Sequence, residues 1–210
     1  MFDIDILNTL MRIPGILIGF VFHEFAHALM ADKLGDSTPR SQGRISLDPR
    51  VHIDIIGFIM ILIFRFGWAK PVMTNPRNYK KPRRDGILVS LAGPFTNLLI
   101  AIVFIFLYRI LNLTDAFSSN ISLQNNVGLL ILNTAYMNIL LFVLNLIPFP
   151  GFDGYHVITN LFNTWKYRIF NILEQYGTFI FIFLAITGVL SRFLMPMVNA
   201  VYIYLQVLIV

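Results

Sequence analysis

Three long runs of the sequence are apolar and contain no charged residue, and they span positions 86–108, 116–152 and 193–210. A helix crosses a bilayer with roughly 18–20 such residues, so each run is near or above that length. Only 13% of all residues are charged and 57% are hydrophobic, whereas about a quarter of a soluble domain is charged. We therefore predict an all-α polytopic membrane protein, forming a single integral-membrane domain over residues 1–210.

The cysteine content and the net charge exclude some kinds of site and of binding partner. The chain has no cysteine, which excludes disulfides and thiolate metal sites. Its net charge of +5 comes from basic residues in loops beside apolar spans, so membrane orientation explains it better than nucleic-acid binding. The first apolar segment lacks a basic leader and a small-residue cleavage site, so we expect it to be retained.

The apolar pattern predicts five to six transmembrane helices. Ile55–Phe64 is apolar but too short to span as a helix. If it does not cross, the loops that carry 13 of the 16 Lys and Arg residues share one side, and positive charge favours the cytoplasm. We therefore expect a short re-entrant or β-hairpin element over Val51–Phe66 and an N-terminus outside; six spans are the alternative. The five expected spans are Ile6–Ala31, Gly86–Ile110, Val127–Ile147, Ile169–Leu190 and Phe193–Ile209.

The stretch HEFAH places two histidines and a glutamate inside the first span. His23 and His27 are four residues apart, so both imidazoles face one side of a helix. This is the spacing of two ligands to one Zn²⁺, with the intervening Glu24 placed to act as general base on a water molecule. Ionisable groups inside a membrane span are costly and indicate a functional site.

Catalytic zinc usually has three protein ligands, so a third one is needed. Asp153 is the best candidate, because it follows a span within NLIPFPGFDG, where two prolines and two glycines break the helix. In the five-span topology it lies on the same side as the end of the first helix. The alternative for Asp153 is a carboxylate that caps a turn or helix. His52, His156 and the other acidic residues are further ligand candidates.

Three motifs in this order, HEFAH, LAGPFTN (Leu91–Asn97) and NLIPFPGFDG (Asn145–Gly154), resemble the site-2 protease family of intramembrane zinc metalloproteases. The GRISLDP and GWAKPV stretches resemble its short bacterial and archaeal members without PDZ or CBS domains. The resemblance implies a metalloprotease with one Zn²⁺ per chain, ligated by His23, His27 and Asp153, and with Glu24 as the catalytic base. It also implies a multi-pass protein of the cell membrane that cleaves transmembrane protein substrates, often in regulated proteolysis, at a site open toward the cytoplasm.

The sequence departs from the family where Phe152 replaces the more frequent leucine and Tyr155–His156 replaces a frequent Gly-Arg pair. His156 is interpreted as an interfacial histidine, although a helical turn would bring it to the site. Asn97 and Asn145 lie within spans, where buried amides need partners. They either bind the substrate backbone or the developing oxyanion, or bond neighbouring helices to one another.

Several loop features have less specific interpretations. Arg44–Leu47 is expected to form a short strand that either pairs with an unwound substrate or forms a structural ribbon. His52 and Asp54 are expected to support the hairpin by hydrogen bonds rather than to bind metal. The basic cluster Lys80–Arg84 is expected to mark the cytoplasmic side and contact anionic lipid.

Two other classes of function compete with the protease. A zinc-binding transporter or sensor would use the same ligands without hydrolysis, but transport favours ionisable residues along a route, and here they gather at one level. A catalytically inactive membrane adaptor would have no need of Glu24 between the histidines. The intramembrane endopeptidase is therefore the leading prediction.

Overall fold

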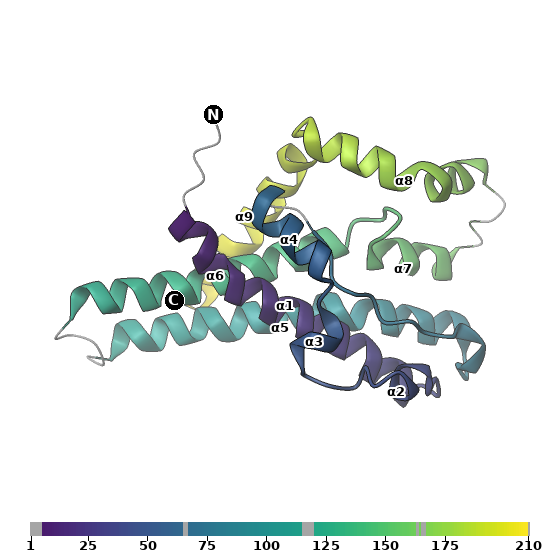
Figure 1. Cartoon of the computed structure of the whole chain (residues 1–210), viewed down its shortest axis with the longest axis horizontal. Helices are drawn as coiled ribbons and strands as arrows, with labels where there is room; N and C mark the ends of the chain where they lie inside the picture. Colours follow the sequence, from purple (N-terminus) through teal and green to yellow (C-terminus); the bar gives the residue numbers. More distant parts are fainter. Residues whose placement is uncertain (1–5, 65–66, 115–119, 163, 165–166, 210) are drawn as a thin grey trace.

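The computed structural model in Figure 1 describes residues 6–64, 67–114, 120–162, 164 and 167–209. Five helices in these ranges are long and apolar enough to cross a membrane, which confirms the predicted all-α class and the count of five for the described part of the chain. They are α1 (Ile6–Lys33), α5 (Pro82–Leu113), α6 (Ile121–Asn145), α8 (Arg168–Ile186) and α9 (Val189–Ile209).

Helices α5, α6 and α9 begin four to six residues earlier than predicted, and α8 begins one residue earlier. Helix α5 starts at Pro82, since proline suits the first turn of a helix, where no backbone N–H is needed. Helix α6 starts at Ile121, because the side chain of Asn120 accepts a hydrogen bond from the N–H of Leu123 and caps the helix. Polar residues at a helix start therefore extend the helices beyond their apolar runs.

The remaining elements are short and lie mostly in the loop between α1 and α5. This loop contains α2 (Thr38–Ser41), α3 (Pro49–His52), α4 (Ile55–Phe64) and the 3₁₀ turn η1 (Pro76–Asn78). One further short helix, α7 (Asp153–Leu161), follows the break after α6. The amphipathic, basic sequence at 160–168 lies partly outside the described residues.

The core of the molecule is a bundle of α1, α5 and α6, which pack on one another, with α9 against α6 and α7 against α5. Figure 1 shows α5 and α6 side by side and α8 at the edge of the molecule. Small and branched residues from three helices form the buried cluster: Ala101, Ile105, Ala135, Ile139, Val143, Leu194, Val198 and Leu205. Helix α1 packs on α5 and α6 beside this cluster, and its face with the two histidines lies against α5.

After α4 the chain comes back along its own path. Ile53 and Ala69 form an antiparallel bridge, and the N–H of Lys70 donates to the carbonyl of His52 over 2.8 Å. Gly57 allows this return, since a Cβ there would clash with the carbonyl oxygen of Trp68. Within the described residues this bridge is isolated, so the β-hairpin part of the prediction for Val51–Phe66 is not realised.

The predicted strand at Arg44–Leu47 is wrong, because these residues form an irregular loop. The Arg44 guanidinium donates to the carbonyls of Val51, Lys70 and Pro71, and the backbone bends at Ile45 and Ser46 instead of running straight as a strand does. Pro49 then begins α3, and Asp48 caps that helix through the N–H of Arg50. The proposed pairing of a substrate with an exposed edge at GRISL therefore loses its structural basis.

His52 and Asp54 make local hydrogen bonds, as the sequence predicted, although the described residues form no β-hairpin for them to support. The Nε2 of the buried His52 lies 2.6 Å from the carbonyl of Ser46. The carboxylate of Asp54 accepts a hydrogen bond from the N–H of Gly57 at the start of α4. Both residues are thus used locally, away from the two histidines of α1.

A buried carboxylate joins the end of α1 to the loop that precedes α5. Asp36 is fully buried and accepts hydrogen bonds from Thr38, from the N–H of Asn75 and from the side chain of Asn78. Burial alone would raise the pKa of Asp36, but these hydrogen bonds outweigh it and hold the pKa below its usual value. The ionised form is therefore favoured in the folded protein.

We expect Asp36→Asn to lower the stability by roughly 1–3 kcal/mol at pH 7, because an amide N–H₂ would face donors that need an acceptor. The folded pKa is depressed, so the advantage of the native aspartate is complete above the unfolded pKa of about 3.9 and is lost as pH falls through the folded value. Thermal unfolding in detergent at pH 7 and at about pH 3 measures this difference. Arg40→Gln, which removes only the solvent-exposed pair with Asp32, should lower the stability much less, because water screens such a pair; an equal loss would contradict the assignment.

Candidate metal centre

The two histidines of α1 direct their Nε2 atoms to one point. These atoms lie 3.0 Å apart in the buried interior, where only 7% and 8% of His23 and His27 are exposed. The spacing of four residues on a helix produces this convergence, as predicted.

Hydrogen bonds on the other ring nitrogen orient each imidazole. The Nδ1 of His23 lies 2.7 Å from the side-chain oxygen of Asn97, and the Nδ1 of His27 lies 2.7 Å from the carbonyl of Val89. Both oxygens are acceptors, so each Nδ1 carries the proton and each Nε2 presents a lone pair. Metal-binding histidines are commonly oriented in this way by a partner outside the ligand set.

Asp153 completes the group. Its Oδ2 lies 3.2 Å from the Nε2 of His23 and 3.3 Å from that of His27, and these three residues form a candidate metal site. Phe152 holds the N-cap position of α7, so Asp153 is not the capping carboxylate that the sequence offered as the alternative. Gly151 has a φ of +95°, a conformation that glycine adopts freely, and it turns the chain so that α7 begins at the site.

The residues present fit a metal ion. The Oδ2 of Asp153 is buried and has no hydrogen-bond partner among the described residues, although a buried carboxylate oxygen ordinarily has one. Two imidazoles and one ionised carboxylate are a common ligand set of catalytic zinc.

Helix α5 passes so close to the site that only glycine fits at position 93. A Cβ on Gly93 would clash with the Nε2 of His27 and would lie 2.5 Å from a ring carbon of His23. Gly93 belongs to the LAGPFTN motif, and sequence reasoning did not assign it a role. A glycine within a long apolar helix was the signal that two helices approach closely there.

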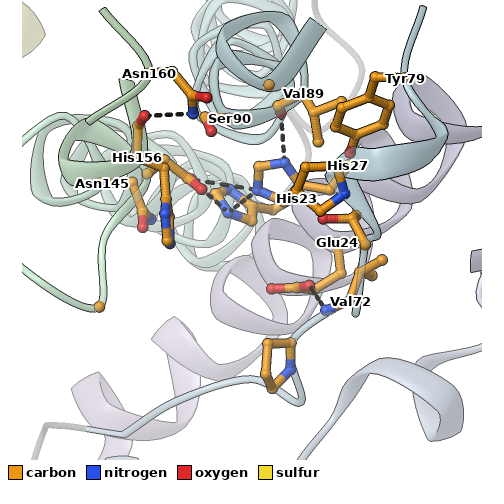
Figure 2. A pocket seen from close by; sticks show the side chains of 16 residues that line it. His23, Glu24, His27, Val72, Tyr79, Val89, Ser90, Asn145, His156 and Asn160 are labelled. Atoms are coloured by element: carbon orange, nitrogen blue, oxygen red, sulfur yellow. Dashed lines mark hydrogen bonds and ion pairs between the residues drawn. The ribbon is translucent and has the colours of Figure 1, made fainter. Parts of the chain in front are cut away.

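Glu24 lies beside the ligands and is held by the backbone of the loop. Its Oε2 accepts a hydrogen bond of 2.9 Å from the N–H of Val72, a contact that Figure 2 shows below the histidines. The residue is only 8% exposed. A glutamate near a metal site can take a proton from a water molecule there.

The ligands open onto a cavity of about 430 Å³. Figure 2 shows His156 and Asn145 on the side of the cavity opposite Glu24. His156 reaches this cavity because α7 is helical from Asp153 onward. The amide nitrogen of Asn145 donates to the carbonyl of Leu141, and contact of Asn145 with a substrate stays a prediction.

Asn97 lies behind the ligands and is fully buried. Besides accepting from His23, it donates to the carbonyl of Gly19 and to the side chain of Asn138. These bonds join α5 to α1 and α6, which is the interhelical alternative that the sequence left open. A substrate or oxyanion contact for Asn97 stays a prediction.

The chain is similar to curated proteins over most of its length. It is 40% identical over 190 residues to a Bacillus subtilis protein named "Putative zinc metalloprotease YwhC", covering 88% of this chain and 84% of the relative. A relative from Mycolicibacterium smegmatis with the same description, Rip2, is 30% identical over 89% of this chain and 70% of its own length. MJ0611 of Methanocaldococcus jannaschii, described likewise, is 29% identical over 74% and 73%.

No protein-family profile matches the chain, and no solved structure matches it. The region aligned with YwhC nevertheless covers more than four fifths of both chains. The chain therefore belongs to the family of proteins described as zinc metalloproteases that includes YwhC.

Proposed function

We propose that this protein is an intramembrane zinc endopeptidase that cleaves peptide bonds within or near transmembrane segments of other membrane proteins. The observation that carries the proposal is the convergence of Asp153 with His23 and His27, which lie together with Glu24 on a helix apolar enough to span a membrane. Descriptions of the relatives as zinc metalloproteases favour this function over a transporter, a sensor or an inactive adaptor. Regulated proteolysis of a signalling factor would be a suitable setting for this activity.

The protein residues divide the work between them. His23, His27 and Asp153 would hold one zinc ion, which when bound supplies a Lewis acid and lowers the pKa of water toward ~7. Glu24 takes the proton from the attacking water and gives it to the amine that leaves. Asn97 holds His23 in the tautomer needed for ligation, and Asn145 is placed in the cavity where it can bind the substrate backbone.

The proposed orientation follows from charge and from the return of the chain after α4. The loops on the side of Lys33 and of the start of α7 carry most of the basic residues, which favours a cytoplasmic location. Helix α4 would then re-enter the membrane without crossing it, a conformation that is tolerated where the backbone packs on protein or lines a water-filled cavity. The site of this cell-membrane protein would open toward the cytoplasm.

Glu24→Gln tests the assignment of the base. We expect cleavage of a transmembrane reporter in proteoliposomes to fall at least about a hundredfold, because general-base catalysis is removed. The zinc content should match that of the native protein, since Glu24 is not one of the proposed ligands and an amide oxygen in its place can still accept from the N–H of Val72. Metal analysis and a gel-based cleavage assay measure both quantities. Undiminished cleavage would show that Glu24 is not the base.

Gly93→Ala tests the metal site without changing a ligand. We expect zinc affinity to fall by more than about tenfold, because the new methyl group displaces the two imidazoles. Zinc competition with a chelator measures the change. Gly128→Ala on α6 is the control, since the nearest neighbours of a Cβ there are side-chain atoms of Tyr108 at 3.2 Å and Leu111 at 3.9 Å, far from the site. Equal zinc affinity of the two variants would place the metal elsewhere.

A further inference from the structure

Arg44 is a buried arginine without an ion pair in the described part of the chain. Only 5% of the residue is exposed, and its guanidinium donates to three carbonyl groups, those of Val51, Lys70 and Pro71. Burial of an arginine without a directly paired carboxylate is costly and calls for a reason. The carbonyls come from both arms of the loop around α4, so Arg44 joins those arms.

One of these carbonyls shares a peptide unit with the group that holds Glu24. The oxygen of Pro71 accepts from Arg44, and the N–H of the same peptide, on Val72, donates to Glu24. A trans peptide is planar and its C=O and N–H point in opposite directions. The guanidinium and the carboxylate therefore bind the two ends of one rigid unit.

The two bonds reinforce each other. A cation on the carbonyl oxygen polarises the peptide and strengthens the bond that its N–H donates. Pro71 has no N–H of its own, so Val72 is the donor that this stretch presents to Glu24. The two bonds also act on position: a peptide that is fixed at its oxygen cannot rotate its N–H away from the carboxylate.

We infer that Arg44 is a positioning residue for the reaction: through the Pro71–Val72 peptide it holds the carboxylate of Glu24 in place beside the metal site. Arg44 itself does not line the cavity and touches no proposed ligand in the described structure. The inference rests on the proposed function, in which Glu24 is the base. It adds to that function the part of the loop that fixes the position of Glu24 for proton transfer.

The test compares Arg44→Gln with Arg50→Gln, a matched loss of one arginine from the same loop. Arg50 is highly exposed and pairs only with Asp48 among the described residues. For Arg44→Gln we expect kcat on a transmembrane reporter to fall by about tenfold to a hundredfold, because misplaced catalytic groups lose rate on this scale. KM should change less than about twofold, since Arg44 does not contact the substrate cavity. Arg50→Gln should match the native protein in both constants.

A second readout does not need cleavage. Hydrogen exchange of the peptide covering residues 69–75, measured by mass spectrometry on zinc-free protein, should be faster in Arg44→Gln than in Arg50→Gln. Arg44→Lys keeps the charge but cannot bond three carbonyls with the geometry of a guanidinium. It should therefore show the faster exchange and a lowered kcat as well, and it decides the matter if Arg44→Gln fails to fold.

The inference is overturned if exchange or kcat is unchanged in Arg44→Gln, or if Arg44→Lys matches the native protein in both. It is also overturned if the loss of kcat in Arg44→Gln only follows lost zinc or lost thermal stability. Glu24→Gln, measured in parallel, separates this failure from that of the proposed function. If Glu24→Gln keeps full activity, Glu24 is not the base and the proposed function fails. If Glu24→Gln is inactive while Arg44→Gln cleaves normally, only the role of Arg44 is refuted.

Discussion

The structure depends on satisfying the polar groups that α1 carries into an apolar bundle. Each group has a partner on another element: His23 meets Asn97, His27 meets a carbonyl of α5, and Glu24 meets the N–H of Val72. Without these partners each buried group would cost several kcal/mol. The requirement brings α5 onto one side of α1 and the loop around α4 onto the other.

The same contacts leave three potential ligand atoms facing one another. Both Nε2 lone pairs and the Oδ2 of Asp153 point to a common centre, since the opposite edge of each imidazole is already occupied. The bundle thus provides hydrogen-bond partners for the atoms that orient the site. Among the described residues, the atoms that would bind metal contact mainly one another. Such preorganisation lowers the cost of gathering three ligands from distant parts of the chain.

The loop between α1 and α5 connects the two helices and also holds a backbone N–H in place beside Glu24. It returns beside its own start, and its second arm passes Glu24 without regular secondary structure. Arg44 and Asp36 fasten the two ends of this loop through buried hydrogen bonds. A segment held in this way can present a backbone N–H to a side chain of α1 without belonging to a regular strand.

The sequence by itself determined the five candidate spans and placed two candidate metal ligands and the proposed base on one helix, because apolar length and i, i+4 spacing are local properties. It also indicated Asp153, through a helix break on the expected side of the membrane. It predicted a strand at Arg44–Leu47 where the structure has a bent loop, because the buried contacts of the Arg44 side chain are with distant carbonyls that the local sequence does not reveal.

Only the tertiary structure decided which backbone groups serve the site. The carbonyl of Val89, the N–H of Val72 and the missing side chain of Gly93 act through their position, and almost any residue offers the first two groups. Sequence patterns report side chains and local periodicity, whereas these contacts join segments tens of residues apart. The physical reason is that nearly every residue has the same backbone N–H and C=O groups. Which of them bond to a given side chain is therefore known only once the helices are packed.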